Sequence, residues 1–450
     1  MLGHLKRLKD RIYNSSFIKS VLTLSAGVVV SQVITICTTP IITRIYSPRI
    51  IGDFSIISSY SVILGAIVCI GLMTAIMLPE DDFEAKKLCR LLLISIVSIT
   101  TIILIICMLI SDEWQLFTVS IDYRQACIIL YINTIFTNVS SVCYGYVNRQ
   151  KMYKVLFWNP SIGTAVNAGI TIGLGLLDCG LWGYVLGNLI AQAVIILHML
   201  FKANPFSGYA GEKSYILLLK EYKKFWIYLL PSNLIGTLAQ QIPTQMISRG
   251  LGSTVLGAYS MCMTVLGLPT RFLAVPINRV FFREAAERYN RGENIGDFSF
   301  RLIKANIKLA LIPIVIIIIF GEPLFRIVLG NGWSQAGTFA SILGIYQLMA
   351  FCNSCLSGKF IIIGRQKTIL VLNIIGSILY FLIFYLCFQF ECSAKLTITT
   401  YASAGALFEI ADTIIFMKQT NVSLRKYLAF VLLYLVLPVV AATFIRLIMF

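Results

Sequence analysis

Long apolar runs follow one another along almost the whole 450-residue chain, and each is close to the length that crosses a lipid bilayer. The hydrocarbon core of a bilayer is about 30 Å thick, so an α-helix needs roughly 20 apolar residues to cross it. A crossing segment must satisfy its own backbone hydrogen bonds, which a helix does. We therefore predict an all-α, polytopic membrane protein with thirteen spans, near 17–43, 50–78, 88–111, 125–147, 155–177, 180–200, 225–248, 254–280, 302–320, 335–358, 368–390, 395–417 and 427–448.

Composition agrees with a membrane protein. Hydrophobic residues make up 58% of the chain and charged residues 13%, whereas soluble proteins carry about 25% charged residues. The net charge is +17, but the basic residues lie in short segments between the apolar runs, where membrane topology accounts for them. Because no basic arm is interleaved with aromatic residues, we do not expect nucleic acid as a partner.

Signatures of enzymes and ATP-driven pumps are missing from the sequence. His4 and His198 are the only histidines, and no HExxH, P-loop or GxGxxG motif occurs. The predicted outward loops are short, which leaves no extracytoplasmic domain to hold a sugar acceptor. We expect a transporter without metal or cofactor, driven by an ion gradient, a substrate gradient or a partner.

The distribution of Lys and Arg sets the predicted orientation. With the N-terminus in the cytoplasm, the inward segments hold 29 of the 37 basic residues and the outward segments hold seven. Cytoplasmic loops are enriched in Lys and Arg, so this asymmetry supports both the number of spans and a cytoplasmic N-terminus. Arg271 is the one basic residue left deep inside a span.

The segment from Thr38 to Ser61 occurs twice. A shift of 205 residues places Arg44, Gly52 and Ser55 on Arg249, Gly257 and Ser260. The recurrence at equivalent places of two halves indicates an internal duplication. Because each half contains six spans, the halves share one orientation and are related by a pseudo-two-fold axis along the membrane normal. Two such bundles enclose a central cleft that suits alternating access.

This reading divides the chain into five parts. The N-terminal segment is either a basic amphipathic helix on the anionic cytoplasmic leaflet or a short basic tail. The last segment is an additional transmembrane helix or an interfacial one. The expected parts are the N-terminal segment 1–16, an N-terminal six-helix lobe 17–200, a cytoplasmic linker 201–224, a C-terminal six-helix lobe 225–417 and the C-terminal segment 418–450.

Arg271 is the main candidate for binding an anionic substrate. A charge deep in a span costs several kcal/mol, roughly 2.5–3.5 on insertion scales, unless it meets water or a partner. Pro269 and Pro276 flank it, so we expect a bent helix with a locally open backbone. A guanidinium suits phosphate oxygens. The alternative is an arginine that snorkels to the interface or pairs internally.

Glu409 and Asp412 are candidates for ion coupling. They lie one helical turn apart on one face of the span at 395–417. Acids within spans typically mark protonation or cation-coupling sites. The alternative is an ion pair that closes the bundle. Gln240 and Gln241, between Pro231 and Pro243, either line a cavity or join helices.

Several segments resemble the bacterial polysaccharide flippases of the Wzx type, which belong to the multidrug/oligosaccharidyl-lipid/polysaccharide (MOP) exporter superfamily. The matching features are the T-x-x-Y-S-P-x-x-x-G-x-F pattern from Thr43 to Phe54 and the acidic Leu78-Pro79-Glu80-Asp81-Asp82. Two further segments match inward and outward turns of the family: FFREAAERYNRGE from Phe281, and GWSQAG at 332–337. The resemblance covers roughly residues 15–417, and the thirteenth span departs from the family's even count.

The resemblance implies two six-helix lobes in a MATE-like V shape in the bacterial inner membrane. It implies transport of an undecaprenyl-diphosphate-linked oligosaccharide, for O-antigen of lipopolysaccharide or for capsule, from the cytoplasmic to the periplasmic leaflet. In such proteins a cationic cavity holds the diphosphate, a role that Arg271 fits. Arg44 and Arg249 either contribute at the outer mouths of the lobes or anchor helix ends. A polymerase and a chain-length regulator are the partner proteins that such a pathway implies, besides membrane lipids.

Three alternatives remain at this point. A drug/cation antiporter of the same superfamily should carry acids deep in the N-terminal lobe, and we place none there. A lipid II flippase would more often show fourteen spans and more cavity arginines. A membrane-embedded enzyme of polysaccharide assembly would need larger loops and catalytic groups outside.

The repeated corner supplies a first prediction. If the two lobes rock against each other, the corners at Ser47 and Gly252 separate when the cleft opens outward. A cross-link between Ser47→Cys and Gly252→Cys should therefore abolish transport, measured as surface polysaccharide before and after reduction of the cross-link. Undiminished transport with complete cross-linking would contradict this mechanism.

Overall fold

The computed structural model describes residues 16–109, 119–207 and 214–449, and within them every regular element is a helix. The amphipathic segment expected at 1–16 lies outside the described residues, apart from Ser16. The helices are α2 (Ser16–Ile45), α3 (Pro48–Val68), η1 (Met73–Met77), α4 (Asp82–Leu109), α5 (Tyr123–Arg149), α6 (Tyr153–Leu176), α7 (Gly180–Lys202), α8 (Tyr215–Glu221), η3 (Phe225–Leu229), α9 (Leu230–Leu266), η4 (Thr270–Ala274), α10 (Val275–Asn290), α11 (Ile295–Leu329), η5 (Asn331–Trp333), α12 (Ser334–Cys355), α13 (Lys359–Ile362), α14 (Gln366–Gln389), α15 (Ala394–Gln419), α16 (Leu424–Val431), η6 (Leu432–Val436) and α17 (Leu437–Met449).

Ten helical stretches of the described chain are long and apolar enough to cross a membrane. One of them, Phe225–Asn290, contains two predicted spans, because Gly252 breaks α9 with φ 85° and ψ 171°. The helices α6 and α15 fall outside these ten, although they have 24 and 26 residues. A polytopic all-α membrane fold is thus confirmed. The largest difference is the second span, where α3 ends at Val68 and a 3₁₀ turn follows.

The chain packs into two compact units. Unit 1 contains residues up to Tyr46 and Ile56–Leu238, and unit 2 contains Ser47–Ser55 and Ala239–Phe450. The first turns of α3 therefore pack with unit 2, and the first turns of α9 pack with unit 1. These bounds follow packing, whereas the predicted lobes followed the order of the spans. Ser47 and Gly252 belong to the same unit, so a separation of these two corners, expected from the order of the spans, does not follow from this division.

In unit 1 the acidic family-like motif joins the start of α4 to the end of α5. Asp82 accepts hydrogen bonds from the Tyr146 hydroxyl at 2.9 Å and from Gln150 Nε2 at 2.7 Å. The Arg149 guanidinium donates to the backbone carbonyls of residues 76, 80 and 81. These contacts give partners to backbone carbonyls of η1 and of the segment that leads into α4. The motif thus fastens two helix ends.

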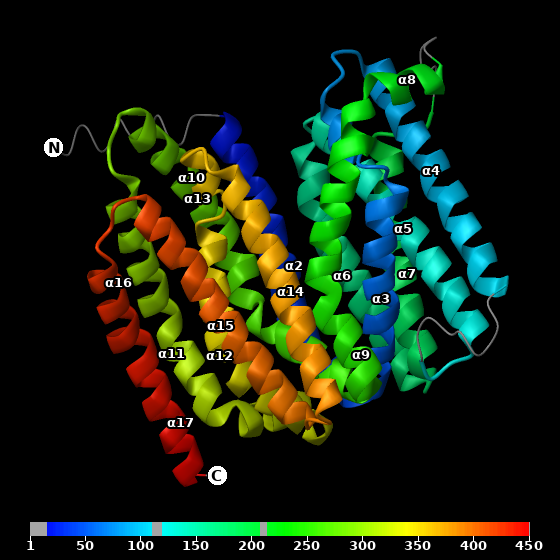
Figure 1. The fold of residues 1–450 in the computed structure, drawn as a ribbon. Helices are drawn as coiled ribbons and strands as arrows, with labels where there is room; N and C mark the ends of the chain where they lie inside the picture. Colours follow the sequence, from blue (N-terminus) through cyan, green and yellow to red (C-terminus); the bar gives the residue numbers. More distant parts are fainter. Residues whose placement is uncertain (1–15, 110–118, 208–213, 450) are drawn as a thin grey trace. The chain divides into compact units, whose positions relative to one another are not determined.

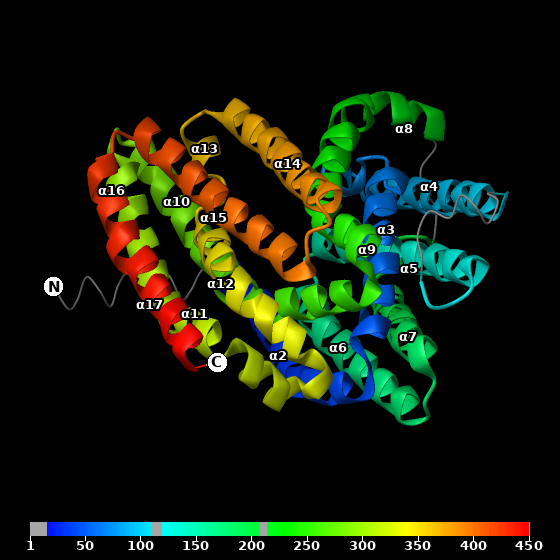
Figure 2. The same ribbon diagram turned by 60° about the horizontal axis from the view of Figure 1, so that its bottom comes forward.

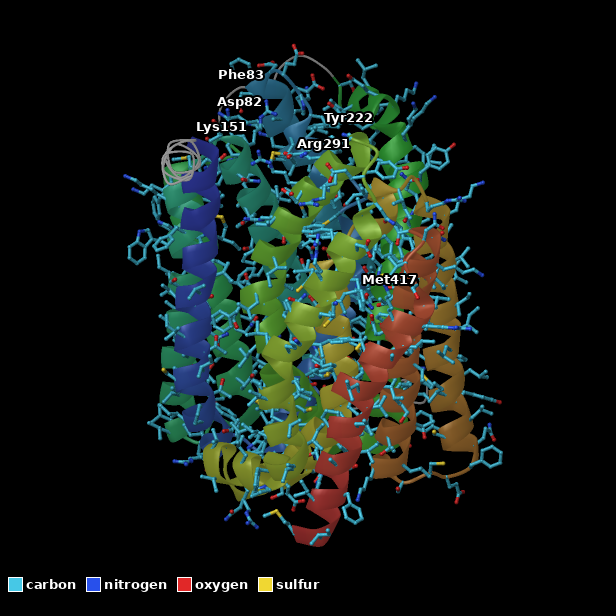
Figure 3. All side chains as sticks on the ribbon, turned by 90° about the vertical axis from the view of Figure 1, so that its left-hand side faces the viewer. Asp82, Phe83, Lys151, Tyr222, Arg291 and Met417 are labelled. Carbon is cyan, nitrogen blue, oxygen red and sulfur yellow. The ribbon has the colours of Figure 1, made fainter. Side chains whose placement is uncertain are left out.

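The linker packs against the same end of unit 1. Leu218 of α8 is fully buried, and the Tyr222 hydroxyl donates to Glu84 Oε1 at 3.1 Å. Figure 3 shows Asp82 and Tyr222 at this end, together with Phe83 and Lys151. All four residues lie in or beside segments predicted to face the cytoplasm, so the predicted inward loops of unit 1 gather at one end.

Tyr46 anchors the end of α2 within unit 1. Its side chain is 2% exposed, and its hydroxyl donates to the Thr171 carbonyl at 2.8 Å. A Cβ at Gly175 or Gly183 would collide with its ring or hydroxyl. The two glycines therefore make the space for this ring, and the close packing expected of small residues in membrane helices is seen here.

The residues that follow Tyr46 make a reciprocal contact in unit 2. A Cβ on Gly52 would collide with the Ser253 carbonyl, and a Cβ on Gly257 would collide with the Pro48 carbonyl. Residues 48 and 253 are related by the same 205-residue shift as the two glycines. The repeat found in the sequence is therefore also a two-fold contact in space, with backbone touching backbone.

The rest of unit 2 is built from α11, α12, α14 and α15, with the last helices alongside. Figure 2 shows α12 beside α15, in agreement with their extensive contact. The helices α16 and α17 lie beside α11 (Figure 1). The ring of Tyr427 lies 6.0 Å from Phe300, and Arg446 lies 3.9 Å from Glu322. The earlier residue of α11 meets the earlier residue of the C-terminal helices, and the later one meets the later one. The last helices and α11 therefore run parallel over most of their length.

The glycine contact generates a stability prediction. Gly52→Ala and Gly257→Ala should each destabilise the protein by about 1–3 kcal/mol, because an added methyl overpacks a backbone contact. The measurement is the thermal unfolding midpoint of the full chain in detergent. Gly169→Ala is the matched control, since no atom lies within 4 Å of a Cβ there, and it should be neutral or slightly stabilising. Equal midpoints for all three variants would contradict the contact.

Candidate functional site

A polar cluster of buried and half-buried side chains joins α12, α13 and α15 in unit 2. The Lys359 ammonium lies 2.8 Å from Asp412 Oδ2 and donates to Asn353 Oδ1 at 2.7 Å. The Asn353 amide donates to Glu409 Oε2 at 2.6 Å, and the Thr413 hydroxyl donates to Asn353 Oδ1 at 3.0 Å. We call these five residues the Lys359 cluster. Both acids singled out in the sequence belong to it.

Local structure brings Lys359 into the bundle. After α12 the chain turns at Gly358 with φ 85°, a conformation that favours glycine. The Lys359 amide then caps the turn by donating to the Leu356 carbonyl at 3.0 Å. The lysine side chain is only 5% exposed, and its ammonium lies 5.4 Å and 5.7 Å from the ring centres of Phe360 and Phe416. These ring faces add a favourable cation–π term.

The cluster contains two carboxyl groups but one ammonium. Asp412 forms the ion pair with Lys359, whereas the Glu409 carboxyl group accepts a hydrogen bond from the neutral Asn353 amide. Asp412 Oδ1 is buried and has no hydrogen-bond partner in the described chain. Burying an unbalanced charge is costly. The arrangement is therefore electrically neutral when Glu409 carries a proton.

Lys359 and Asn353 were missed as site residues in the sequence. Lys359 counted there only as one of the basic residues of the inward segments. The actual ion pair joins residues 53 positions apart, which helical periodicity does not reveal. Asp412 thus forms an ion pair within the bundle, which was the alternative considered for it in the sequence.

Arg271 lies in η4, a π-helical turn between Pro269 and Val275. Its side chain is exposed on the surface of unit 2, and it makes no hydrogen bond or ion pair with any described residue. The irregular backbone agrees with the open helix expected from the flanking prolines, and π-turns of this kind occur often at functional sites. No hydrogen bond links Arg271 to the Lys359 cluster.

The remaining predicted residues occupy two helices. Arg44 is exposed near the end of α2 in unit 1. Arg249 and Gln240 are exposed on α9 in unit 2, and Gln241 is half-buried there. Within unit 2 these three therefore share one helix, but the structure does not bring them to the Lys359 cluster.

Asp53 is a buried acid that the sequence analysis overlooked. It is 0% exposed and lies in the first turns of α3, next to Gly52. It lies near the start of the predicted second span, and the structure places it in unit 2 beside the tight contact of Gly52 and Gly257.

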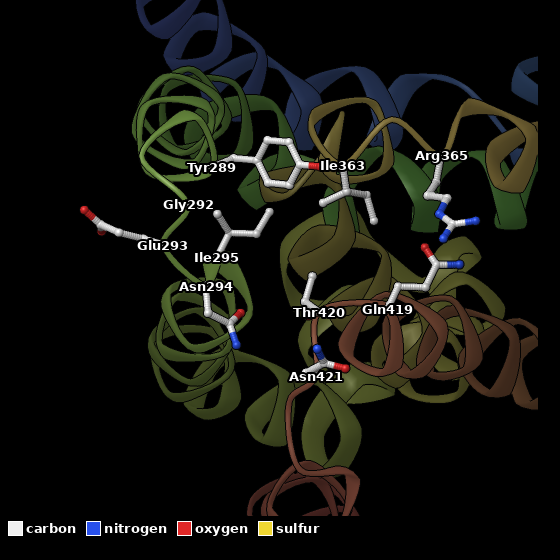
Figure 4. Close-up of a pocket in the computed structure, with 10 residues that line it drawn as sticks. All are labelled: Tyr289, Gly292, Glu293, Asn294, Ile295, Ile363, Arg365, Gln419, Thr420 and Asn421. Carbon is white, nitrogen blue, oxygen red and sulfur yellow. The ribbon is translucent and has the colours of Figure 1, made fainter.

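A polar hollow of about 340 Å³ lies at one end of unit 2 (Figure 4). Its lining comes from the turns after α10, α13 and α15, and includes Tyr289, Glu293, Asn294, Ile363, Arg365, Gln419, Thr420 and Asn421. In the described part of the chain, no group of three or more His, Cys, Asp and Glu residues is placed to hold a metal.

Comparison of the chain with known protein families shows which family it belongs to. The model of a family described as polysaccharide biosynthesis protein matches residues 41–338, more than half of the chain. The chain belongs to this family. No curated protein matches the sequence.

Several solved structures share the fold over nearly their whole length. One, of the lipid II flippase MurJ in an inward closed conformation, has a TM-score of 0.67 at 13% identity and covers 95% of this chain and 97% of its own. An outward-facing multidrug resistance MATE transporter of the MOP superfamily has a TM-score of 0.56 at 13% identity, covering 90% and 96%. A MOP superfamily transporter from Pyrococcus furiosus has 0.54 at 12%, covering 89% and 94%.

These likenesses show the fold and leave the substrate open. The MATE-like fold and the kinship with a polysaccharide biosynthesis family, both expected from the sequence, are confirmed. The solved structures of similar fold are those of membrane transporters and of a lipid flippase.

The ion pair of the cluster predicts a strong coupling between two side chains. Lys359→Met should destabilise the protein by about 3 kcal/mol, because it leaves the Asp412 carboxylate buried without its partner. Adding Asp412→Leu should recover much of that loss. Thermal unfolding of both single variants and the double variant, as a double-mutant cycle, measures the coupling. Lys367→Met removes an exposed lysine nearby and should change little; additive effects at 359 and 412 would refute the pairing.

Proposed function

We propose that this protein is a flippase for undecaprenyl-diphosphate-linked oligosaccharides, the repeat units of O-antigen or capsule. It moves them from the cytoplasmic to the periplasmic leaflet of the bacterial inner membrane by alternating access. The last helix crosses the membrane in this proposal, because it runs parallel to α11 along most of that helix.

The observation that carries the proposal is Arg271. Within a family of polysaccharide biosynthesis proteins, this chain holds an arginine inside a span, in a π-turn, without a partner among the described residues. A guanidinium left without an internal partner is available for a ligand anion, and its planar fork matches diphosphate oxygens. An uncharged drug or sugar alone would not require such a group.

The other predicted residues take supporting roles. Arg44 and Arg249 add positive charge for the lipid-linked anion, and Gln240 and Gln241 offer amide groups to sugar hydroxyls. The Lys359 cluster supplies the driving step, with Glu409 taking up and releasing a proton as unit 2 changes shape. A buried carboxyl group whose neutral form balances its surroundings is suited to this exchange.

Lipid II is the rival substrate, because the fold of MurJ is similar over nearly the whole chain. Both substrates carry the same undecaprenyl diphosphate, so Arg271 does not separate them. Depletion of the cell's lipid II flippase does so: rescue of growth by this chain would favour lipid II, and rescue of surface polysaccharide in a flippase-deficient strain would favour the proposal.

Two substitutions test the assigned roles. In a strain that lacks this protein, Arg271→Ala and Glu409→Gln should each reduce surface polysaccharide severely, by about tenfold or more if each group supplies 1.4 kcal/mol or more to the slow step. The readout is polysaccharide on gels at matched protein levels. Arg283→Ala, which removes a charge from an exposed ion pair, is the control. Full restoration by both test variants would remove these residues from the mechanism.

A further inference from the structure

The Lys359 ammonium contacts two oxygen atoms, one from α15 and one from α12. Asp412 Oδ2 and Asn353 Oδ1 lie 2.8 Å and 2.7 Å from it. Carboxylate and amide oxygens are also the ligands that hard metal cations take in proteins. In this cluster two such oxygens bind a cation that belongs to the chain itself, the Lys359 ammonium.

The surroundings of the ammonium leave little room for a second cation. Its two oxygen partners use two of the three N–H donors, and the rings of Phe360 and Phe416 face its remaining side. The lysine is almost fully buried. A metal ion at the same place would have to displace this side chain and would meet its positive charge.

We propose that Lys359 is a built-in cation that selects the coupling ion: it occupies the place of a metal cation at Asp412 and Asn353, so that the cluster exchanges a proton on Glu409 and no metal ion. The inference rests on the proposed function, in which Glu409 drives transport. It adds the identity of the ion and the residue that determines it. Asp412 remains paired throughout, and Glu409 is the carboxyl group left to titrate.

Other titratable groups face the two acids from every packed element. Those with electrostatic interactions with Glu409 or Asp412 are Tyr346 and Cys352 of α12, Lys359 of α13, Tyr380 of α14 and Tyr427 of α16. The phenols and the thiol are neutral near pH 7, so Lys359 is the one positive charge in this set. The proposal therefore assigns the charge balance to three groups, namely the lysine and the two acids.

Removal of the amine tests the proposal directly. Lys359→Ala leaves a hole lined by Asp412, Asn353 and Thr413 oxygens, and Na⁺ should enter it. With purified full-length protein, we expect saturable ²²Na⁺ binding and a rise of the unfolding midpoint with NaCl but not with choline chloride. Wild type should show neither, and Lys359→Ala combined with Asp412→Asn should lose both. Lys359→Met, which fills the hole, is the matched control and should not bind Na⁺.

The outcomes separate a lysine that selects the coupling ion from one that only pairs with Asp412. A folded Lys359→Ala variant that binds no Na⁺ would reduce Lys359 to a structural ion-pair partner. Saturable Na⁺ binding by wild type that Asp412→Asn removes would overturn the proposal, and this measurement stands even if the alanine variant does not fold. Lys359→Gln provides a second, less disruptive removal of the charge, with the same gain of Na⁺ binding expected.

Failure here is distinguishable from failure of the proposed function. Na⁺ binding by purified protein requires no lipid-linked sugar, whereas the polysaccharide assay in cells requires no knowledge of the ion. If Lys359→Ala gains Na⁺ binding but Glu409→Gln leaves surface polysaccharide unchanged, the ion site stands and its role in flipping is rejected.

Discussion

The structure depends on one constraint, which is that a polar group surrounded by apolar helices must find a partner within the protein. The Tyr46 hydroxyl meets this constraint at the Thr171 carbonyl, and Arg149 meets it at the Ile76 carbonyl of η1. The Lys359 cluster meets it with five side chains from three helices. Arg271 differs from these groups: its side chain is exposed, and it makes no hydrogen bond or ion pair with a described residue, which leaves it available to a ligand anion.

Much of the fold was accessible from the sequence because helices that cross a membrane are coded locally. A continuous apolar run of sufficient length predicts a helix without knowledge of its neighbours, and the thirteen predicted spans all coincide with helices. The second span was drawn too long because Ile70 and Gly71, both with positive φ, end the helix inside an apolar run. Hydropathy carries no information on such a turn.

The candidate site was accessible only in part. Glu409 and Asp412 stood out because acids are rare in spans, and both belong to the cluster. Their partners depend on how α12 and α13 pack against α15, which no local pattern encodes. Asp53 was missed for a related reason: its full burial depends on packing in three dimensions. The sequence repeat identified the neighbouring Gly52 and Gly257 as equivalent without showing that they touch.

The reciprocal contact of Gly52 and Gly257 has a meaning for the origin of the chain. Residue 52 meets 253 and residue 257 meets 48, so each half presents the same small surface to the other. This is the geometry of an isologous dimer interface, in which one patch is complementary to itself. An ancestor of half the length would already have possessed the patch needed to pair with its own copy. Gene fusion would then have preserved an existing homodimer contact and removed its dependence on concentration.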